Sequence, residues 1–158
     1  MAAERAERGD PLQDDDALRK ARPLIFMRVR AEFLAHRKLP DLPGEQARWY
    51  WGPGAFRRAR EEYPDAFVKN CDKWWDGYND EEVVITKCFL GKNAPPHEVR
   101  QWGERHPFRA QVQRGRRYMT IRPQIVIVTS ALAPAEIWKH DHHMVGGLEW
   151  RYEIVEVE

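Results

Sequence analysis

The feature that most constrains the fold is a run of four β-branched residues, 125–128 (Ile-Val-Ile-Val), which is the clearest signal of a buried strand in the chain. Residues 83–85 (Val-Val-Ile) and 48–51 (Arg-Trp-Tyr-Trp) are two further short segments typical of strands. Segments with helical character precede and separate these strands, over residues 24–38, 55–62 and 97–105. Because strands that alternate with helices usually pair in parallel, the sequence predicts an α/β fold with a sheet flanked by helices.

Two further segments complete the expected strands. Residues 110–113 and 118–121 flank Gly115 and predict a β-hairpin, while residues 152–157 alternate weakly, which indicates an edge strand. A chain of 158 residues is about the size of one domain. We expect three parts, namely a charged, disordered tail at 1–20, a helix and linker at 21–45, and a folded domain at 46–158.

The composition excludes a membrane protein. Charged residues make up 32% of the chain, the formal net charge is +1, and no apolar run approaches the roughly 20 residues that cross a bilayer. The charged N-terminus has no apolar stretch of the kind found in secretory signals. We therefore expect an intracellular protein, in the nucleus or the cytoplasm, with no membrane partner. Because the net charge is so small, the distribution of charge matters more than its sum.

A glycine-rich turn, Gly52-Pro53-Gly54, joins an expected strand to an expected helix, which is where a phosphate-binding loop would lie. A working P-loop reads G-x-x-x-x-G-K-[ST]; its amides cradle phosphates, its lysine contacts the outer phosphates and its hydroxyl holds Mg²⁺. Counted from Gly52, Arg57 occupies the second glycine position and Arg58 the lysine position, and alanine follows them. The segment is therefore interpreted as a remnant P-loop; taken alone, it would be an ordinary Gly-Pro turn.

Three further segments carry a more specific pattern. They are residues 73–78 (Lys-Trp-Trp-Asp-Gly-Tyr), residues 105–108 (Arg-His-Pro-Phe), and the strand at 125–130 with Pro134 and Trp138 after it. Together with the glycine turn, they resemble the helicase half of the replication-associated (Rep) proteins of small circular single-stranded DNA viruses, of circovirus type. The resemblance implies a P-loop NTPase-like, superfamily 3 helicase fold over residues 46–158. It also implies a ring homo-oligomer, single-stranded DNA binding, and ATP hydrolysis with Mg²⁺ in intact relatives.

This chain departs from the resembled pattern at the positions that perform ATP chemistry. Relatives place two acidic residues after the strand at 83–85, where this chain has Lys87 and Cys88. Relatives carry an asparagine after the next strand, where this chain has Ala131, and an arginine pair near the C-terminus is reduced to Arg151 as the candidate arginine finger. Because phosphoryl transfer depends on positioned charges and the metal, we expect no ATP or Mg²⁺ cofactor and no ATPase activity, although the resembled family is enzymatic.

Five residues around the expected hairpin form the candidate nucleic-acid site: Arg109, Arg114, Arg116, Arg117 and Tyr118. Arginine side chains follow a phosphate backbone and aromatic rings stack on bases. In the resembled family a hairpin at this place faces the DNA. A solvated arginine-rich hairpin without a ligand is an equally weighted alternative. Residues 140–143 (His-Asp-His-His) include metal-ligand types, but we interpret them as a polar loop and expect no metal site.

Three functions remain open on the sequence. The first is an ATPase-deficient Rep-like helicase domain that binds single-stranded DNA, with RNA as an alternative, or associates with Rep-like subunits. The second is a decayed or truncated relic without activity. Under each of these functions we expect the nuclease domain of the resembled family to be missing, since only a short charged tail precedes the first expected helix. The third is an active ATP-dependent helicase, which the missing residues place below the first.

Overall fold

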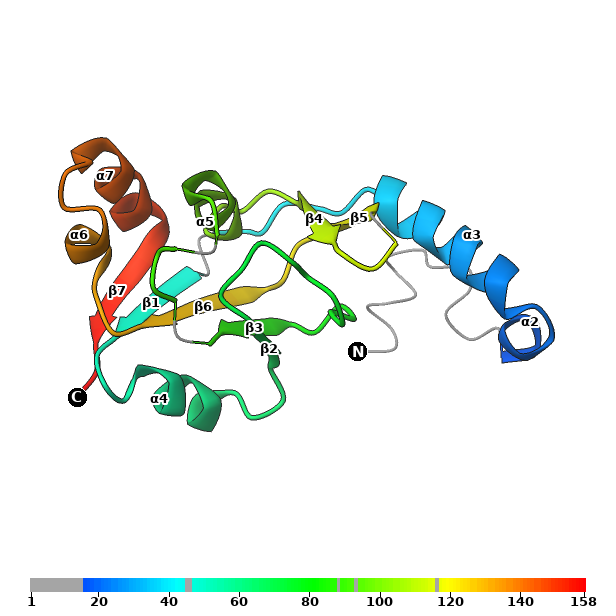
Figure 1. The fold of residues 1–158 in the computed structure, drawn as a ribbon, viewed down its shortest axis with the longest axis horizontal. Coiled ribbons are helices and arrows are strands. Elements are labelled where there is room, and N and C mark those ends of the chain that lie inside the picture. Colours follow the sequence, from blue (N-terminus) through cyan, green and yellow to red (C-terminus); the bar gives the residue numbers. More distant parts are fainter. Residues whose placement is uncertain (1–15, 45–46, 88, 93, 116) are drawn as a thin grey trace.

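The computed structural model describes residues 16–44, 47–87, 89–92, 94–115 and 117–158 (Figure 1). Cys88 and Arg116, two of the candidate site residues, lie outside the described residues. The elements follow one another along the chain as α2 Asp16–Ala21, α3 Pro23–His36, β1 Ala47–Trp51, α4 Ala55–Glu62, β2 Phe67–Lys69, β3 Val83–Thr86, α5 Pro96–Trp102, β4 Phe108–Val112, β5 Arg117–Ile121, β6 Ile125–Ser130, α6 Pro134–Ile137, α7 His142–Arg151 and β7 Tyr152–Glu156.

A five-stranded sheet forms the centre of the molecule, with its strands in the order β2-β3-β6-β1-β7. Every pair of neighbouring strands in it is parallel. The α/β fold predicted from the sequence, with a parallel sheet flanked by helices, is confirmed (Figure 1). So is the edge position of the last strand, because β7 pairs only with β1. The predicted hairpin also forms, as the antiparallel pair β4 and β5.

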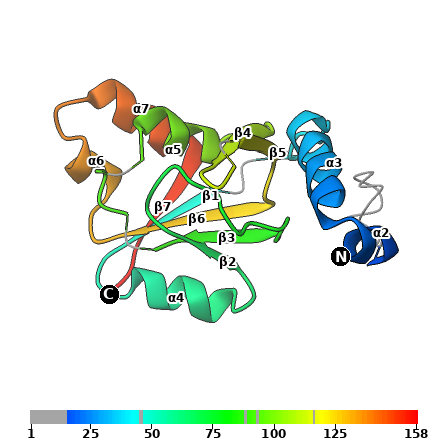
Figure 2. The same ribbon diagram turned by 45° about the vertical axis from the view of Figure 1, so that its right-hand side comes forward.

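Helices cover both faces of this sheet, as Figure 2 shows with α4 on one face and α5 and α7 on the other. Side chains of successive strand residues point to opposite faces, so Trp49 packs in the larger core cluster and Tyr50 in the smaller one. The smaller cluster lies under α4, where Ala55 and Ala59 pack against Ile127 and its neighbours. The sheet is therefore buried on both sides, which explains the uninterrupted apolar run that marks β6.

Helices α2 and α3 extend from the end of the molecule next to the hairpin (Figure 1). Helix α3 contacts β5, and the hydroxyl of Thr120 donates a hydrogen bond of 2.9 Å to the carbonyl oxygen of Ala35. Just beyond α3, the buried guanidinium of Arg37 binds both carboxylate oxygens of Asp80, at 2.8 and 2.7 Å. The C-terminal end of α3 is therefore fixed to the loop before β3 and to the hairpin.

Two sequence predictions about local structure are wrong. The predicted disordered tail at 1–20 is wrong for residues 16–20, because α2 begins at Asp16, whose carboxylate pairs with Arg19 one turn later at 3.4 Å, and residues 1–15 lie outside the described residues. Residues 140–143 are not a loop throughout, because Asp141 caps helix α7 by accepting a 3.0 Å hydrogen bond from the amide of Met144. Among the described residues, no helix combines the length and the apolarity needed to cross a membrane.

Candidate functional site

The carboxyl ends of β1, β3 and β6 lie side by side at one edge of the sheet, because the three strands are adjacent and parallel. In such sheets this edge is where ligands bind. The structure thus brings together Gly52 after β1, Lys87 after β3 and Ala131 after β6, which the sequence analysis placed in one nucleotide site. The amide of Gly52 donates to the carbonyl oxygen of Ser130 at 2.9 Å, so β1 and β6 remain paired up to this edge.

The glycine turn itself is closed rather than open. The amide of Ala55 donates a hydrogen bond of 3.2 Å to the carbonyl oxygen of Gly52, so Gly52, Pro53 and Gly54 form a tight turn into α4. Proline has no amide hydrogen, and the amides of Gly52 and Ala55 are already bonded within the protein. A phosphate cradle needs several amides aimed at a common point, and two of the amides of this turn already donate within the protein.

The last two residues of the chain lie directly against this turn. The amide of Val157 donates to the carbonyl oxygen of Trp51 at 2.7 Å. A Cβ atom placed on Gly52 would come within 1.9 Å of the carbonyl oxygen of Val157, and one on Gly54 within 2.5 Å of that of Glu158. Gly52 also has a φ of +120°, which favours glycine. The turn therefore faces carbonyl oxygens, whose partial negative charge opposes the binding of phosphate.

The two arginines of the remnant loop are paired along helix α4. Arg58 donates to the carboxylate of Glu62 at 3.0 Å, and its guanidinium lies 5.1 Å from the centre of the Tyr50 ring. The side chain of Arg57 is 80% exposed and lies 4.0 Å from the carboxylate of Glu61. Both cations thus have acidic partners one turn further along the helix, instead of serving the glycine turn.

The hydroxyl groups at the ends of β3 and β6 are also engaged. The hydroxyl of Thr86 accepts a 3.0 Å hydrogen bond from the amide of Thr129, and the hydroxyl of Ser130 donates to the carbonyl oxygen of Phe89 at 2.5 Å. Phe89 is fully buried at this edge and packs against Trp49 with ring centres 5.5 Å apart. The segment after β3 therefore serves packing here. The side chains of Lys87 and Ala131 are exposed beside it.

Arg151, the candidate arginine finger, lies at the end of α7 and is bound within its own chain. Its guanidinium contacts the carboxylate of Glu104 at 3.1 and 3.2 Å and donates to the carbonyl oxygen of Gly147 at 2.8 Å. Only 20% of the side chain is exposed. Reaching a neighbouring subunit would require breaking these contacts.

The hairpin of β4 and β5 presents a polar outer face that carries part of the predicted nucleic-acid site. Arg109 and Tyr118 lie diagonally across the two strands, and the guanidinium of Arg109 is 4.7 Å from the centre of the Tyr118 ring. Arg114 is exposed in the turn that joins the strands. Arg117 lies on the opposite, inner face, level with Val112. The structure therefore brings Arg109 and Tyr118 together on the outer face, leaves Arg114 in the turn, and places Arg117 on the other face.

A residue missed by the sequence analysis holds the tip of this hairpin. The carboxylate of Asp76 accepts hydrogen bonds from the amides of Gln113 and Arg114, at 2.9 and 3.0 Å. Burial would raise the pKa of Asp76, but these amide hydrogen bonds outweigh it and lower the pKa below its usual value. The signal was present in the segment at 73–78, where an aspartate precedes a glycine, but its partner is more than thirty positions away.

Two aromatic residues of the same segment, Trp75 and Tyr78, pack in the core. Trp75 is fully buried, and its ring forms edge-to-face contacts with those of Tyr78, Trp102 and Phe108, with centroids 5.4–5.9 Å apart. The amide of Trp75 donates to the carbonyl oxygen of Gln111 in β4 at 2.9 Å. The segment at 73–78 is therefore the support on which the hairpin rests.

Comparison with known proteins finds replication-associated proteins of circoviruses. The chain is 30% identical over 90 residues to the "Replication-associated protein" of Beak and feather disease virus, covering 57% of this chain and 30% of the viral protein. It is 32% identical over 87 residues to that of Canary circovirus, covering 55% of this chain and 29% of the relative. No family model matches the chain. The matched part thus spans less than a third of the length of these relatives.

Proposed function

Circovirus replication-associated proteins are homologues of this chain, and on that premise we propose that it is a Rep-like helicase domain related to rolling-circle DNA replication. In this proposal the domain has lost ATP hydrolysis and keeps the binding of single-stranded nucleic acid. The observation that carries the proposal is the outer face of the β4–β5 hairpin, where Arg109 lies on Tyr118 with Arg114 at the tip.

The loss of ATPase activity is supported by the edge of the sheet where the nucleotide would bind. The turn at Gly52 is closed by hydrogen bonds and faces backbone carbonyl oxygens. Lys87 places a positive charge where a divalent cation would need a carboxylate, and Ala131 offers no hydrogen bond. Because the parts of a phosphoryl-transfer site act as one unit, the loss of the amide cradle, metal ligands and sensor together removes the activity.

The binding of single strands is supported by the chemistry of the hairpin. A guanidinium that lies on an aromatic ring leaves the other side of that ring for a base, while the charge remains near the strand's phosphates. The hydrogen bonds of Asp76 hold the tip in place, so the arginines are presented on a defined backbone. Contacts of this kind do not read base sequence, and we expect binding without sequence preference.

We expect the protein to bind a short fluorescein-labelled thymidine strand with an affinity that falls steeply with salt and does not respond to Mg-ATP. Alanine at both Arg109 and Arg114 should reduce the slope of log K against log salt by about 0.7 for each phosphate contact removed. Tyr118→Ala should weaken binding by roughly tenfold through lost stacking. Fluorescence anisotropy across a salt series, with and without Mg-ATP, measures all three effects.

Arg60→Ala is the matched control, because Arg60 is an exposed arginine on helix α4, away from the hairpin. It should leave the salt slope unchanged. An affinity that changes with Mg-ATP would contradict the proposed loss of the nucleotide site and favour an active helicase. The absence of any binding at low salt would leave the relic as the better account.

Association with other subunits is a second candidate function, favoured by the exposed apolar side chains of α3. Leu24 and Ile25 are 80% and 45% exposed, Met27 is 54% exposed, and Val29, one turn after Ile25, is 44% exposed. A helix that is apolar on several sides usually lies against a partner. We propose a second Rep-like subunit as that partner.

If α3 is the interface, Leu24→Lys combined with Ile25→Lys should convert an oligomer into a monomer, because a lysine charge is costly to bury between subunits. Light scattering after size-exclusion chromatography gives the mass of each variant. Lysine in place of Ala135, an exposed residue of α6, is the control and should leave the mass unchanged. A wild-type protein that is monomeric at all concentrations would rule out this function.

A further inference from the structure

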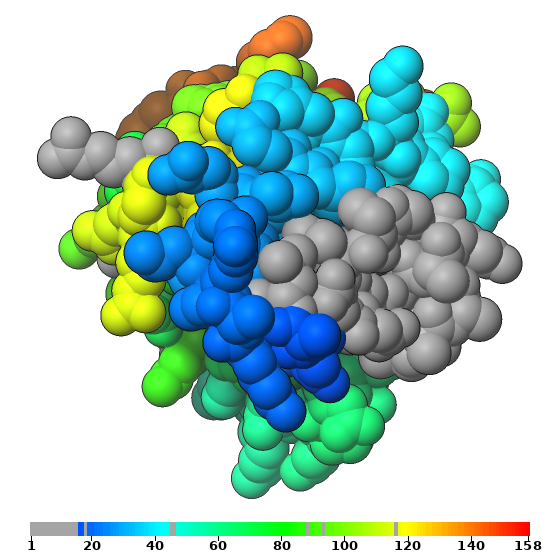
Figure 3. All heavy atoms as spheres, turned by 90° about the vertical axis from the view of Figure 1, so that its right-hand side faces the viewer, coloured from blue at the N-terminus to red at the C-terminus, as the bar shows by residue number. Residues whose placement is uncertain are grey.

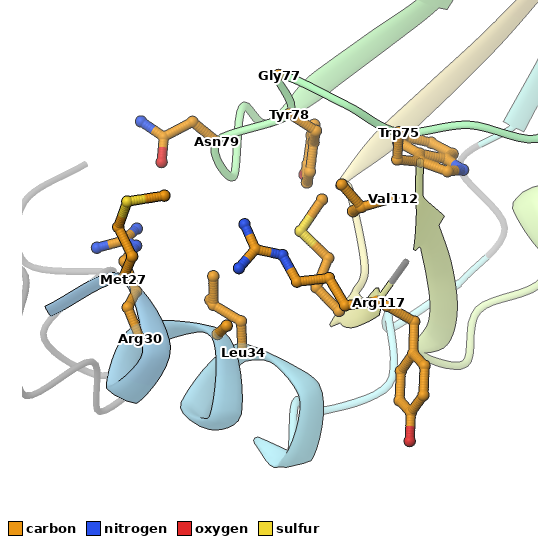
Figure 4. A pocket seen from close by; sticks show the side chains of 12 residues that line it. Met27, Arg30, Leu34, Trp75, Gly77, Tyr78, Asn79, Val112 and Arg117 are labelled. Carbon is orange, nitrogen blue, oxygen red and sulfur yellow. The ribbon is translucent and has the colours of Figure 1, made fainter. Parts of the chain in front are cut away.

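A cavity of about 220 Å³ lies between helix α3, the inner face of the hairpin and the loop after Trp75 (Figure 4). Figure 3 shows the end of the molecule where α3 and the hairpin lie next to each other. The apolar part of the wall comes from Leu34 of α3, Tyr78 of the loop, and Val112 and Met119 of the hairpin. The cavity is separate from the carboxyl ends of β1, β3 and β6, because Gly52, Lys87 and Ala131 do not line it.

Two arginines give this apolar space a positive charge. Arg30 of α3 and Arg117 of β5 both line the cavity, and Figure 4 shows the guanidinium of Arg117 extending between Leu34 and Tyr78. Arg117 is exposed and Arg30 is half-buried. The cavity thus combines an apolar interior with guanidinium groups that can reach an anion attached to whatever enters it.

The volume suits one aromatic ring system. An engineered protein cavity of about 150 Å³ lined by apolar side chains takes up benzene, so about 220 Å³ leaves room for a somewhat larger ring. Tyr118 connects this cavity to the outer face of the hairpin, because its ring carries Arg109 and the residue also lines the cavity.

We propose that the cavity receives one base of the bound single strand, while the exposed Arg117 contacts a phosphate next to that base. This inference rests on the proposed function and adds a base-binding site to it. A flexible single strand can turn a base out of its stack at low cost, and an apolar cavity accepts bases without reading their hydrogen-bonding edges.

The surrounding charge favours a nucleic acid over a protein side chain as the occupant. Arg28 is exposed on the same helix as Arg30, and Arg114 is exposed at the hairpin tip. Among the described residues, Asp76 accepts amides of the tip, and Glu32 of the same helix lies 3.6 Å from His36. A polyanion therefore meets attraction from several sides at the entrance.

The test fills the cavity without changing the charge. Ala31→Phe places a ring in the cavity from α3, while Ala135→Phe makes the same change at an exposed position of α6 that does not line the cavity. We measure the affinity of each full-length variant for a labelled thymidine strand and for an abasic strand of equal length. Ala31→Phe should weaken binding of the thymidine strand about tenfold and leave the abasic strand unaffected, whereas Ala135→Phe should change neither.

Thermal unfolding of each variant shows whether the fold is intact, and Ala31→Met, which fills less of the cavity, replaces Ala31→Phe if the latter does not fold. Unchanged binding of the thymidine strand by a folded cavity-filling variant would overturn the base site and leave the hairpin proposal standing. An equal loss for both strands, or a change in self-association instead of in DNA binding, would also overturn it. If the wild-type protein binds neither strand, the proposed function itself fails.

Discussion

Replacing Arg37 by leucine should lower the free energy of unfolding by about 3–5 kcal/mol, the usual cost of leaving one partner of a buried ion pair alone. The side chains of Arg37 and Asp80 are only 2% and 14% exposed, and the two groups form a bidentate pair. Arg37 also donates from Nε to the carbonyl oxygen of Thr120 at 2.8 Å. Urea unfolding of the purified protein at neutral pH measures the loss.

The pair itself is isolated by adding Asp80→Leu. The double variant should be less destabilised than the two single variants taken together, because neither charge is then left without its partner. Arg60→Leu changes an exposed arginine and should shift the free energy of unfolding by no more than about 0.5 kcal/mol. An effect of Arg37→Leu as small as that would mean that water reaches this pair and that the ion pair does not fix α3.

Replacing Trp49 by alanine should lower the free energy of unfolding by about 3–5 kcal/mol, because it opens a cavity in the centre of the sheet. The Trp49 ring is fully buried and packs edge-to-face against Phe89, Trp138 and Tyr152, with centroids 5.5, 6.0 and 5.7 Å away. Its indole nitrogen donates to the carbonyl oxygen of Leu132 at 3.0 Å. Since the free energy of unfolding of a domain is about 5–15 kcal/mol, this loss is a large part of the total.

Two further substitutions serve as comparisons for Trp49→Ala in the same unfolding experiment. Trp49→Phe keeps most of the packing but loses the hydrogen bond, so its effect should be clearly smaller than that of alanine. Trp150 is 74% exposed, and Trp150→Ala should have an effect within about 0.5 kcal/mol. If Trp49→Ala and Trp150→Ala lowered the free energy of unfolding equally little, the cluster of Trp49, Phe89, Trp138 and Tyr152 would not stabilise the fold as its contacts indicate.

The parts of the fold that could be predicted from the sequence are those with a local signal. The apolar run of β6 reflects burial on both faces, and the hairpin follows from alternation around Gly115. Strand β2 has no such signal, because it is three residues long and ends in Lys69. Helix α7 contains two adjacent glycines and little amphipathic pattern, so only its capping aspartate marked its beginning.

The candidate site was predictable in its residue types but not in its arrangement. Aligned strand ends explain why Gly52, Lys87 and Ala131 meet, since parallel strands share one edge. The closure of the turn and the approach of Val157 to it depend on the pairing of β7, which no nearby residue signals. The separation of Arg117 from Arg109 follows from the register of the hairpin. Arg109 pairs with Thr120 and shares its face, whereas Arg117 is an odd number of positions from Thr120 in β5 and therefore points to the other face.

The placement of β1 between β6 and β7 has a consequence for biosynthesis. Ala47 pairs with Val126 on one side and with Tyr152 on the other, so both neighbours of this strand are made long after it. At roughly 5–20 residues per second, a ribosome takes roughly 5–20 s to add the ~100 residues that separate β1 from β7. Within that interval the aromatic strand lacks both neighbours until β6 is made and lacks one until β7 is made, and such long-range pairing is slow to form. The nascent chain is therefore a natural client for chaperones that hold extended apolar segments, irrespective of what the finished domain binds.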